Sequence, residues 1–257
     1  MFIEFYKYQG TGNDFIIIDD REVVFDIEDH ALIASLCERR MGIGADGLIL
    51  LRSHTDLDFE MIYFNSDGFK STMCGNGGRC IVAFAQMLKI IDGKATFMAI
   101  DGEHKAEITK DTVYLSMQDV SDIEVVDDAL VIDTGSPHYI KMVDDLHSLD
   151  VDKEGRKIRS SILFREEGVN VNFVLDDSEF ELRTYERGVE AETLSCGTGV
   201  VATAIAMYHT NYTKEDVVSV RTKGGVLTVD FEEFNGSYRN IWLTGEVGMV
   251  YAGEFEC

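Results

Sequence analysis

The sequence is poor in proline, in basic residues and in long apolar runs. The longest apolar runs, such as FIII at 15–18 and VVATAIAM at 200–207, fall well short of the roughly 20 residues that a membrane-spanning helix needs. The opening segment MFIEFYKYQG does not combine a basic stretch with an apolar one. We therefore expect no signal peptide, no membrane partner and a cytoplasmic protein.

Basic residues are outnumbered by acidic ones, 23 against 47, which gives a formal net charge of −24. Binding to phosphate groups needs clustered lysine and arginine, so this balance excludes nucleic acid and anionic membranes as expected partners. With 45% hydrophobic residues over 257 positions, the chain is long and apolar enough to build a large core or two ordinary ones.

Cysteine is scarce and irregularly spaced. Five cysteines form no disulfide framework and no CxxC pair, and the six histidines are scattered, so neither a redox pair nor a metal site is expected. We interpret Cys37 and Cys80 as small core residues, and Cys257 at the terminus indicates no role.

Two of the cysteines open a repeated motif. CGNGGRC stands at 74–80 and CGTGVVA at 196–202, so the two cysteines are 122 positions apart (196 minus 74). The surrounding positions repeat as well, in the same order of strand, loop, CGxG, apolar helix and glycine turn. The matched positions are Tyr63 with Tyr185, Asn65 with Arg187, and Gly102 with Gly224.

This repeat predicts an α/β (α+β) chain of two similar domains. Segments rich in alternating or β-branched apolar residues indicate strands, and the segments after Cys74 and Cys196 indicate helices that are apolar nearly all round and therefore buried. We expect domains at 1–117, carrying Cys74 and joined by the tail 247–257, and at 118–246, carrying Cys196. They meet near the acidic, weakly patterned stretch at 117–130. The other expected elements are strands at 2–9, 14–19, 47–51, 58–65, 173–176 and 180–187, and a helix at 28–40.

A cysteine that begins a CGxG motif at the start of a helix has a defined chemistry. The first N–H groups of a helix lack internal partners and carry the positive end of the dipole, so a thiol there ionises more easily and a carboxylate can dock. Two such ends brought together by a pseudo-twofold suggest a carboxylate with a thiol on each side. Inversion of an α-carbon needs this arrangement, because one thiolate removes the proton and the other thiol delivers one from the opposite face.

Other classes of function explain less of the pattern. A binding protein that had lost turnover predicts the replacement of one cysteine, and both are present. A thiol-dependent hydrolase requires a histidine directed at one cysteine, and such a mechanism leaves the second cysteine unexplained.

Long motifs in a fixed order make the whole chain resemble the diaminopimelate epimerase family. They are GTGNDF at 10–15, RRMGIGADGL at 39–48, YFNSDG at 63–68, MCGNGGRC at 73–80, GSPH at 135–138, GVNVNF at 168–173, YERG at 185–188 and SCGTG at 195–199. The resemblance implies two pseudo-twofold-related domains, each a mixed sheet wrapped around a central buried helix. It also implies a substrate cleft between them, no PLP, no metal and a homodimer.

The resemblance assigns roles to individual residues. Cys74 and Cys196 match the two catalytic thiols, and Asn13 matches a substrate-contacting asparagine. Glu186 and His138 match polar groups that hold the substrate amino group and tune the thiol pKa values. Helix-end amides that hold the reacting carboxylate match Gly75, Asn76, Gly197 and Thr198, and groups that grip the distal end of the substrate match Asn65, Asn170 and Arg187.

Two positions depart from the family pattern. Ser136 stands where members often carry asparagine, and Gly47 where some carry glutamine, so contacts at the distal end of the substrate are expected to differ. The chain is thus expected to interconvert LL- and meso-diaminopimelate, and the alternative is a PLP-independent racemase of the same fold for another amino acid. Without the resemblance, His138 after Pro137, the only proline, indicates a turn and no more.

Overall fold

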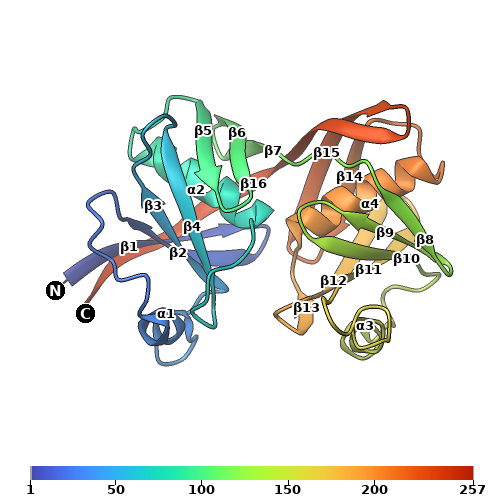
Figure 1. Cartoon of the computed structure of the whole chain (residues 1–257), viewed down its shortest axis with the longest axis horizontal. Coiled ribbons are helices and arrows are strands. Elements are labelled where there is room, and N and C mark those ends of the chain that lie inside the picture. Colours follow the sequence, from blue (N-terminus) through green and yellow to red (C-terminus); the bar gives the residue numbers. More distant parts are fainter. Residues whose placement is uncertain (1, 257) are drawn as a thin grey trace. The chain divides into compact units, whose positions relative to one another are not determined.

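The computed structural model describes residues 2–256, so Cys257 lies outside the described residues. The chain forms two compact units. Unit 1 comprises Met1–Leu115 and Gly245–Cys257, and unit 2 comprises Ser116–Thr244. In Figure 1 the last strand, in red, runs beside the first strand, in blue, within unit 1.

The elements of unit 1 form a sheet around one long helix, with a shorter helix outside. They are β1 (Phe2–Gly10), β2 (Asn13–Asp19), α1 (His30–Cys37), β3 (Gly47–Arg52), β4 (Phe59–Asn65), α2 (Gly75–Met87), β5 (Lys94–Ala99), β6 (Gly102–Thr109), β7 (Thr112–Ser116) and the second half of β16 (Ser237–Glu256).

The sheet of unit 1 closes on itself. Its strands follow one another in chain order from β1 to β7, and β16 lies next to both β7 and β1. The parallel neighbours β2–β3 and β4–β5 are the pairs separated by helices, and the remaining neighbours from β1 to β7 are antiparallel. Strands such as β6 (GEHKAEIT) alternate between buried and solvent-facing residues, because one face of the sheet packs on the enclosed helix.

Unit 2 repeats this plan. Its elements are β8 (Ile123–Val126), β9 (Ala129–Asp133), β10 (Pro137–Met142), α3 (Val151–Arg159), β11 (Asn170–Asp176), β12 (Phe180–Glu186), β13 (Ala191–Thr193), α4 (Gly197–His209), β14 (Val217–Thr222), β15 (Gly225–Phe234) and the first half of β16.

Apart from the short strand β13, which pairs with β12, the strand pairings follow those of unit 1. The pairs β10–β11 and β12–β14 are parallel across α3 and α4, as β2–β3 and β4–β5 are across α1 and α2. The sheet order runs from β16 through β15, β14, β12, β11, β10 and β9 to β8. The segment before β8 returns to β16 through the bridge Val120–Tyr238, so this sheet also curls around its helix. The predicted fold of two similar sheet-and-helix units is confirmed.

The two enclosed helices are of equal length, and their burial explains their composition. α4 buries every residue from Gly197 to Met207, and α2 buries Gly75 to Val82 with Phe84 and Ala85. Helices that are apolar nearly all round need burial on every side, and the surrounding sheets provide it. Cys37 and Cys80 are buried in the core of unit 1, as expected. No helix in the described part of the chain is long and apolar enough to cross a membrane.

One local expectation was wrong, and one strand was not expected. The stretch at 117–130, interpreted as the place where the two domains join, contains β8, whose residues Ile123–Val126 pair with β9. His138, interpreted as a turn residue because it follows Pro137, lies within β10 and is fully buried. Proline is tolerated as the first residue of a strand, where its missing N–H breaks no interior ladder bond.

Candidate active site

Each thiol of the repeated motif is the N-cap of an enclosed helix. Cys74 (φ −112°, ψ 116°) precedes α2, and Cys196 (φ −119°, ψ 109°) precedes α4. The first intrahelical bonds run from Gly78 N to Cys74 O at 2.7 Å and from Val200 N to Cys196 O at 2.9 Å. The two units therefore present the same device, a sulfur at the positive end of a buried helix.

The amides assigned to carboxylate binding lie in the first helical turns. Gly75 and Asn76 open α2, and Gly197 and Thr198 open α4. Residues this early in a helix have no carbonyl four positions back within the helix, so their N–H groups are donors for an anion. In unit 1 the next amide, that of Gly77, already points at the Cys74 sulfur, at 3.5 Å.

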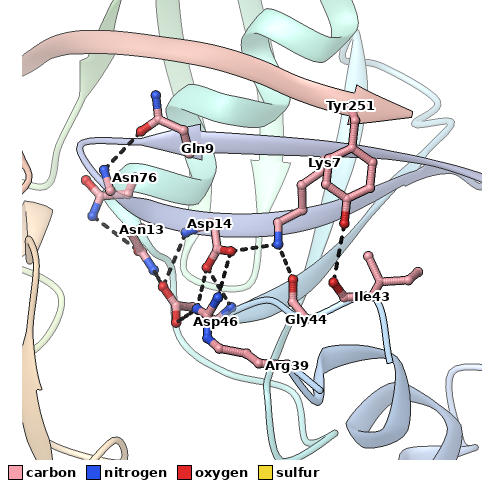
Figure 2. A network of polar contacts seen from close by, with 11 residues as sticks. Lys7, Gln9, Asn13, Asp14, Arg39, Ile43, Gly44, Asp46, Asn76 and Tyr251 are labelled. Atoms are coloured by element: carbon pink, nitrogen blue, oxygen red, sulfur yellow. Dashed lines mark hydrogen bonds and ion pairs between the residues drawn. The ribbon is translucent and has the colours of Figure 1, made fainter. Parts of the chain in front are cut away.

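Asn13 contacts the Cys74 thiol, and its orientation is fixed by an acid. Its Nδ2 donates to Asp46 Oδ2 at 2.6 Å, so its Oδ1 faces the other way. That oxygen lies 3.6 Å from Cys74 Sγ and accepts from Asn76 Nδ2 at 3.2 Å. Figure 2 shows Asn13 between Asp46 and Asn76. A carboxylate only accepts hydrogen bonds, so the amide cannot turn over, and the thiol faces a carbonyl oxygen.

A charged network holds Asp46 in place (Figure 2). Arg39 forms ion pairs with Asp46 and with Asp14, both at 2.6 Å, and Asp14 pairs with the buried Lys7 at 2.6 Å. Burial would raise the pKa of Asp14, but hydrogen bonds from Arg39 and Lys7 outweigh it and lower that pKa to about 2. Asp14 therefore stays ionised at neutral pH, and the network anchors the segment that carries Asn13.

Arg79 is a buried cation in the second turn of α2, within the CGNGGRC motif. Its guanidinium donates only to neutral oxygens: Asn76 Oδ1 at 2.5 Å, Thr11 Oγ1 at 3.1 Å and the carbonyl of Gly75 at 3.3 Å, with the carbonyl of Glu246 at 3.5 Å. Across residues 2–256 no carboxylate forms an ion pair with it. Burial lowers the pKa of Arg79 to about 10, and a negative charge on Cys80 or Cys74 would act against that shift. In α4 the matching position is Val201.

In unit 2 the group next to the thiol is a buried histidine. Thr198 Oγ1 lies 3.5 Å from Cys196 Sγ and 2.9 Å from His138 Nε2. The other ring nitrogen, Nδ1, lies 2.9 Å from Asn172 Nδ2. Burial, with a smaller contribution from the charge of Arg187, lowers the pKa of His138 to about 3. The imidazole is therefore neutral over the whole physiological range.

Keeping His138 neutral is expected to make stability depend on pH. A solvated histidine has a pKa of about 6.5, so below that value the unfolded chain binds a proton that the folded chain does not. The contribution of this pKa difference to the free energy of unfolding is complete above about pH 6.5 and is lost as pH falls toward 3. Between pH 7 and pH 5 we expect wild type to lose about 2 kcal/mol more unfolding free energy than His138→Gln. Urea unfolding at both pH values measures this, and equal losses in the two proteins would contradict it.

Two of the three residues assigned to the distal end of the substrate, Asn170 and Arg187, form one cluster in unit 2, whereas Asn65 lies at the end of β4 in unit 1. Asn170 Oδ1 accepts from the backbone N of Arg187 at 2.9 Å, and its Nδ2 donates to Ser136 Oγ at 2.9 Å. Arg187 Nη2 donates to the same Ser136 oxygen at 3.1 Å. Ser136, one of the two departures from the family pattern, is thus a link between the asparagine and the arginine.

The other departure has a steric cause in unit 1. Asn65 ends β4 opposite Gly47 of β3. A Cβ on Gly47 would lie 2.5 Å from both Tyr63 Cε2 and the carbonyl oxygen of Phe64. The Tyr63 ring therefore occupies the space that a longer side chain at position 47 would need.

Glu186 lies at the end of β12, beside Arg187, and is partly buried. Its Oε1 accepts a hydrogen bond from Thr193 of β13, the short strand that pairs with β12. The structure therefore groups Cys196, His138, Thr198, Asn170 and Arg187 around the ends of neighbouring elements of unit 2, with Glu186 at the edge of that group. Cys74, Asn13 and Asn76 form the corresponding group in unit 1.

Several residues of these networks escaped the sequence interpretation, among them Asp46, Arg79, Asn172 and Thr184, whose hydroxyl donates to Asn172 Oδ1 at 2.9 Å. Three of them stand inside motifs that were singled out, GIGADG, CGNGGRC and GVNVNF. Their contacts join positions far apart in the sequence, which spacing alone does not reveal. An arginine inside a helix that is otherwise apolar was the one signal that could have been followed.

Comparison with known proteins decides the family. The family model described as "Diaminopimelate epimerase" matches residues 5–121 and 130–250. The chain belongs to the diaminopimelate epimerase family. A relative of that name from Flavobacterium psychrophilum is 52% identical over 97% of this chain and 98% of its own length. Another, from Aquifex aeolicus, is 39% identical over 98% and 97%. The resemblance seen in the sequence is confirmed, and membership of this family makes the chain an epimerase.

Solved structures show that the fold extends beyond the diaminopimelate epimerase family. A phenazine biosynthesis protein of the PhzF family from Bacillus anthracis superposes with a TM-score of 0.76 at 15% identity, covering 100% of both chains. A hydroxyproline epimerase from Agrobacterium vitis superposes with a TM-score of 0.72 at 14% identity, covering 98% of this chain and 92% of its own. At such low identity these likenesses concern the fold alone.

Proposed function

We propose that this epimerase interconverts LL-2,6-diaminopimelate and meso-diaminopimelate without a cofactor, by proton transfer between Cys74 and Cys196. This reaction supplies precursors for lysine and peptidoglycan. The observation that carries the proposal is the duplicated thiol at the start of an enclosed helix, once in each repeated unit of a chain of this family. A single nucleophile or redox thiol does not explain the duplication.

The chemistry requires two groups of the same kind with opposite protonation. One sulfur enters the reaction as a thiolate and takes the α-proton, while the other enters as a thiol and gives its proton to the opposite face of the carbon. The reverse reaction exchanges the two roles. The carbanion that forms between the two steps is stabilised through its carboxylate by first-turn amides, those of Gly75, Asn76, Gly197 and Thr198.

The distal cluster supports a substrate with a second carboxylate. Arg187 presents a planar cationic donor, and its neighbours Asn170 and Ser136 are neutral hydrogen-bonding groups. Such a set suits a carboxylate, because guanidinium and carboxylate form paired, charge-assisted hydrogen bonds. The cyclic amino acids named for the hydroxyproline epimerase lack a distal carboxylate and would leave this arginine without a substrate partner.

Replacement of Arg187 by methionine is expected to weaken binding more than it slows chemistry. The lost contact lies far from the reacting carbon and is made in both the ground state and the transition state. We expect KM for diaminopimelate to rise about 100-fold and kcat to fall less than about tenfold. Steady-state kinetics measure the split between the two constants.

A matched control for this variant is Arg221→Met, which removes an exposed arginine that pairs with Glu179 on the surface of unit 2. It should leave both constants unchanged. A second control uses diaminopimelate with the distal carboxylate converted to an amide. The amide should be a poor substrate for wild type and no poorer for Arg187→Met. If the amide substrate and the Arg187→Met replacement each lowered activity independently, so that their losses added, Arg187 would be shown not to bind the distal carboxylate.

The choice of substrate is tested with a panel. Purified, reduced protein is incubated with LL-diaminopimelate, proline, 4-hydroxyproline and histidine, and the stereoisomers are separated by chiral chromatography. Conversion of diaminopimelate alone is the expected result. Conversion of another member of the panel in its place would favour the alternative, a racemase of the same fold whose distal end is set by Ser136 and Gly47.

Three further proposals complete this function. The functional halves are 1–117 with 247–257, and 118–246, each contributing one thiol. A homodimer is expected from the family resemblance, and light scattering measures it. Localisation in the cytoplasm fits a mechanism that needs both thiols reduced, because that compartment keeps cysteines in the thiol form.

A further inference from the structure

Unit 2 buries a chain of polar side chains under its helix where unit 1 has apolar ones. A Cβ on Gly199, the third residue of α4, would lie 2.6 Å from Asn172 Oδ1 and 3.3 Å from His138 Cε1. At the matching residue of α2, Gly77, a Cβ would meet Ile49 and Met61. The repeated architecture therefore packs well without polar groups at this place. Burial of an asparagine and a histidine costs free energy that an apolar pair avoids, which points to a role beyond packing.

The orientation of the Asn172 amide is determined by its neighbours. Its Oδ1 accepts from Thr184 Oγ1 at 2.9 Å. Its Nδ2 lies 3.3 Å from the carbonyl oxygen of Asn170 and 3.4 Å from that of Tyr139, both of which only accept. The NH₂ group therefore faces the carbonyls and the histidine, and the amide cannot be turned over without loss of these contacts.

This orientation selects one tautomer of His138. Asn172 Nδ2 donates to His138 Nδ1 at 2.9 Å, so Nδ1 carries no proton. A neutral imidazole then carries its proton on Nε2, which donates to Thr198 Oγ1 at 2.9 Å. The hydroxyl proton of Thr198 is not needed for that contact and is available to the Cys196 sulfur, 3.5 Å away.

We infer that Asn172 and Thr184 are positioning residues that hold His138 in its Nε2-protonated form, so that the Thr198 hydroxyl donates to the Cys196 sulfur. Each group in this series of hydrogen bonds donates to the next one toward the thiol. A hydrogen-bond donor stabilises the thiolate more than the thiol. The inference deepens the proposed function and rests on it only for the catalytic meaning of Cys196.

Few charged side chains lie near this series of hydrogen-bonded groups. Glu186 and Arg187 stand at the adjoining end of β12, and Arg187 is the one whose charge acts on His138. The first turn of α4 carries no acidic side chain, and β11 has none before Asp176. Unit 2 therefore places a neutral relay of hydrogen bonds beside its thiol, and unit 1 has the guanidinium of Arg79 in the first turns of its enclosed helix.

The tautomer is tested first, in the wild-type chain. Long-range ¹H–¹⁵N NMR of the histidine side chains distinguishes Nε2–H from Nδ1–H, and His138→Gln identifies the signal. We expect the neutral Nε2–H form of His138 at pH 7 and still at pH 5. The Nδ1–H form, or an imidazolium at pH 5, would overturn the inference without any variant of the relay having to fold.

The effect on the thiol is tested by alkylation. Iodoacetamide labelling of Cys196 is followed against pH, with peptide mass spectrometry separating it from Cys74. Thr198→Val, which removes the hydroxyl and keeps the shape, is expected to lower the neutral-pH alkylation rate of Cys196 about tenfold. Thr198→Ser keeps the hydroxyl and should react like wild type. Asn172→Leu should act in the same direction as Thr198→Val and also mix the tautomers of His138.

Cys74 in the same samples is the internal control, and its rate should not change. Unchanged alkylation of Cys196 in a folded Thr198→Val protein would overturn the inference. None of these readouts uses diaminopimelate. Failure of wild type to epimerise diaminopimelate would therefore refute the proposed function and leave the relay to be decided by the tautomer and the thiol.

Discussion

Alanine at either Cys74 or Cys196 is expected to lower kcat for epimerisation by about 10³-fold or more. Without one sulfur the α-carbon has a base on one face and no proton donor on the other, so the configuration cannot invert. The double variant should be no slower than either single variant, because the two thiols act as a unit and removal of one already prevents inversion.

The control for these variants is Cys37→Ala. Cys37 is a free thiol like the other two, but it is buried in the core around α1, where burial raises its pKa to about 12. Its replacement should lower stability slightly and leave kcat unchanged. Wild-type turnover in Cys74→Ala or in Cys196→Ala, with protein shown to be free of wild-type contamination, would refute the two-thiol mechanism.

Replacement of Arg79 by methionine is expected to lower kcat/KM at pH 7 about 30- to 100-fold. A buried cation without a carboxylate partner acts on the nearest groups that can become anionic, and one of those is the Cys74 thiol, whose charge in turn acts on the arginine. Loss of the guanidinium should raise the pKa of Cys74, and it also weakens the field that favours a carboxylate at the start of α2.

A catalytic effect of Arg79 can be separated from a structural one. The variant should regain much of its activity relative to wild type near pH 9, where the thiol ionises without help, and alkylation of Cys196 should be unaffected. Arg79→Lys, which keeps the charge, should lie between wild type and the methionine variant. A uniform loss at every pH, accompanied by a lower melting temperature, would indicate that Arg79 serves only to hold Thr11 and Asn76.

Much of the fold could be predicted because the sequence contains an internal repeat, and each half of the repeat folds into a similar unit. The spacing of 122 positions between the CGxG motifs carries over to the helices that follow them and to the glycine turns near Gly102 and Gly224. Local patterns failed where tertiary context decides. Acidic residues on both sides of a short edge strand obscured β8, and Pro137 suggested a turn where a strand begins. α3 was missed, because it is short and mostly charged, with only Val151 and Gly155 buried.

The groups at the helix starts could be predicted from the sequence, but the residues that orient the side chains around them could not. Thiols and first-turn amides follow from one motif, since a helix N-terminus is a local feature. The orientation of Asn13 depends on Asp46, 33 positions away, and that of His138 on Asn172, 34 positions away. Such contacts are made by neighbouring strands, and a single sequence does not show which strands are neighbours. The roles of the residues in catalysis stay predictions.

The most direct test of the central claim is where solvent hydrogen enters during the first turnovers. Purified, reduced protein is mixed with LL-diaminopimelate in deuterated water without added PLP, and the reaction is stopped at low conversion. Proton transfer between two thiols predicts one deuterium on the inverted α-carbon of the meso product and none in the recovered LL substrate. Deuterium in the recovered substrate to the same extent as in the product would show that a single base serves both faces, which would contradict the account.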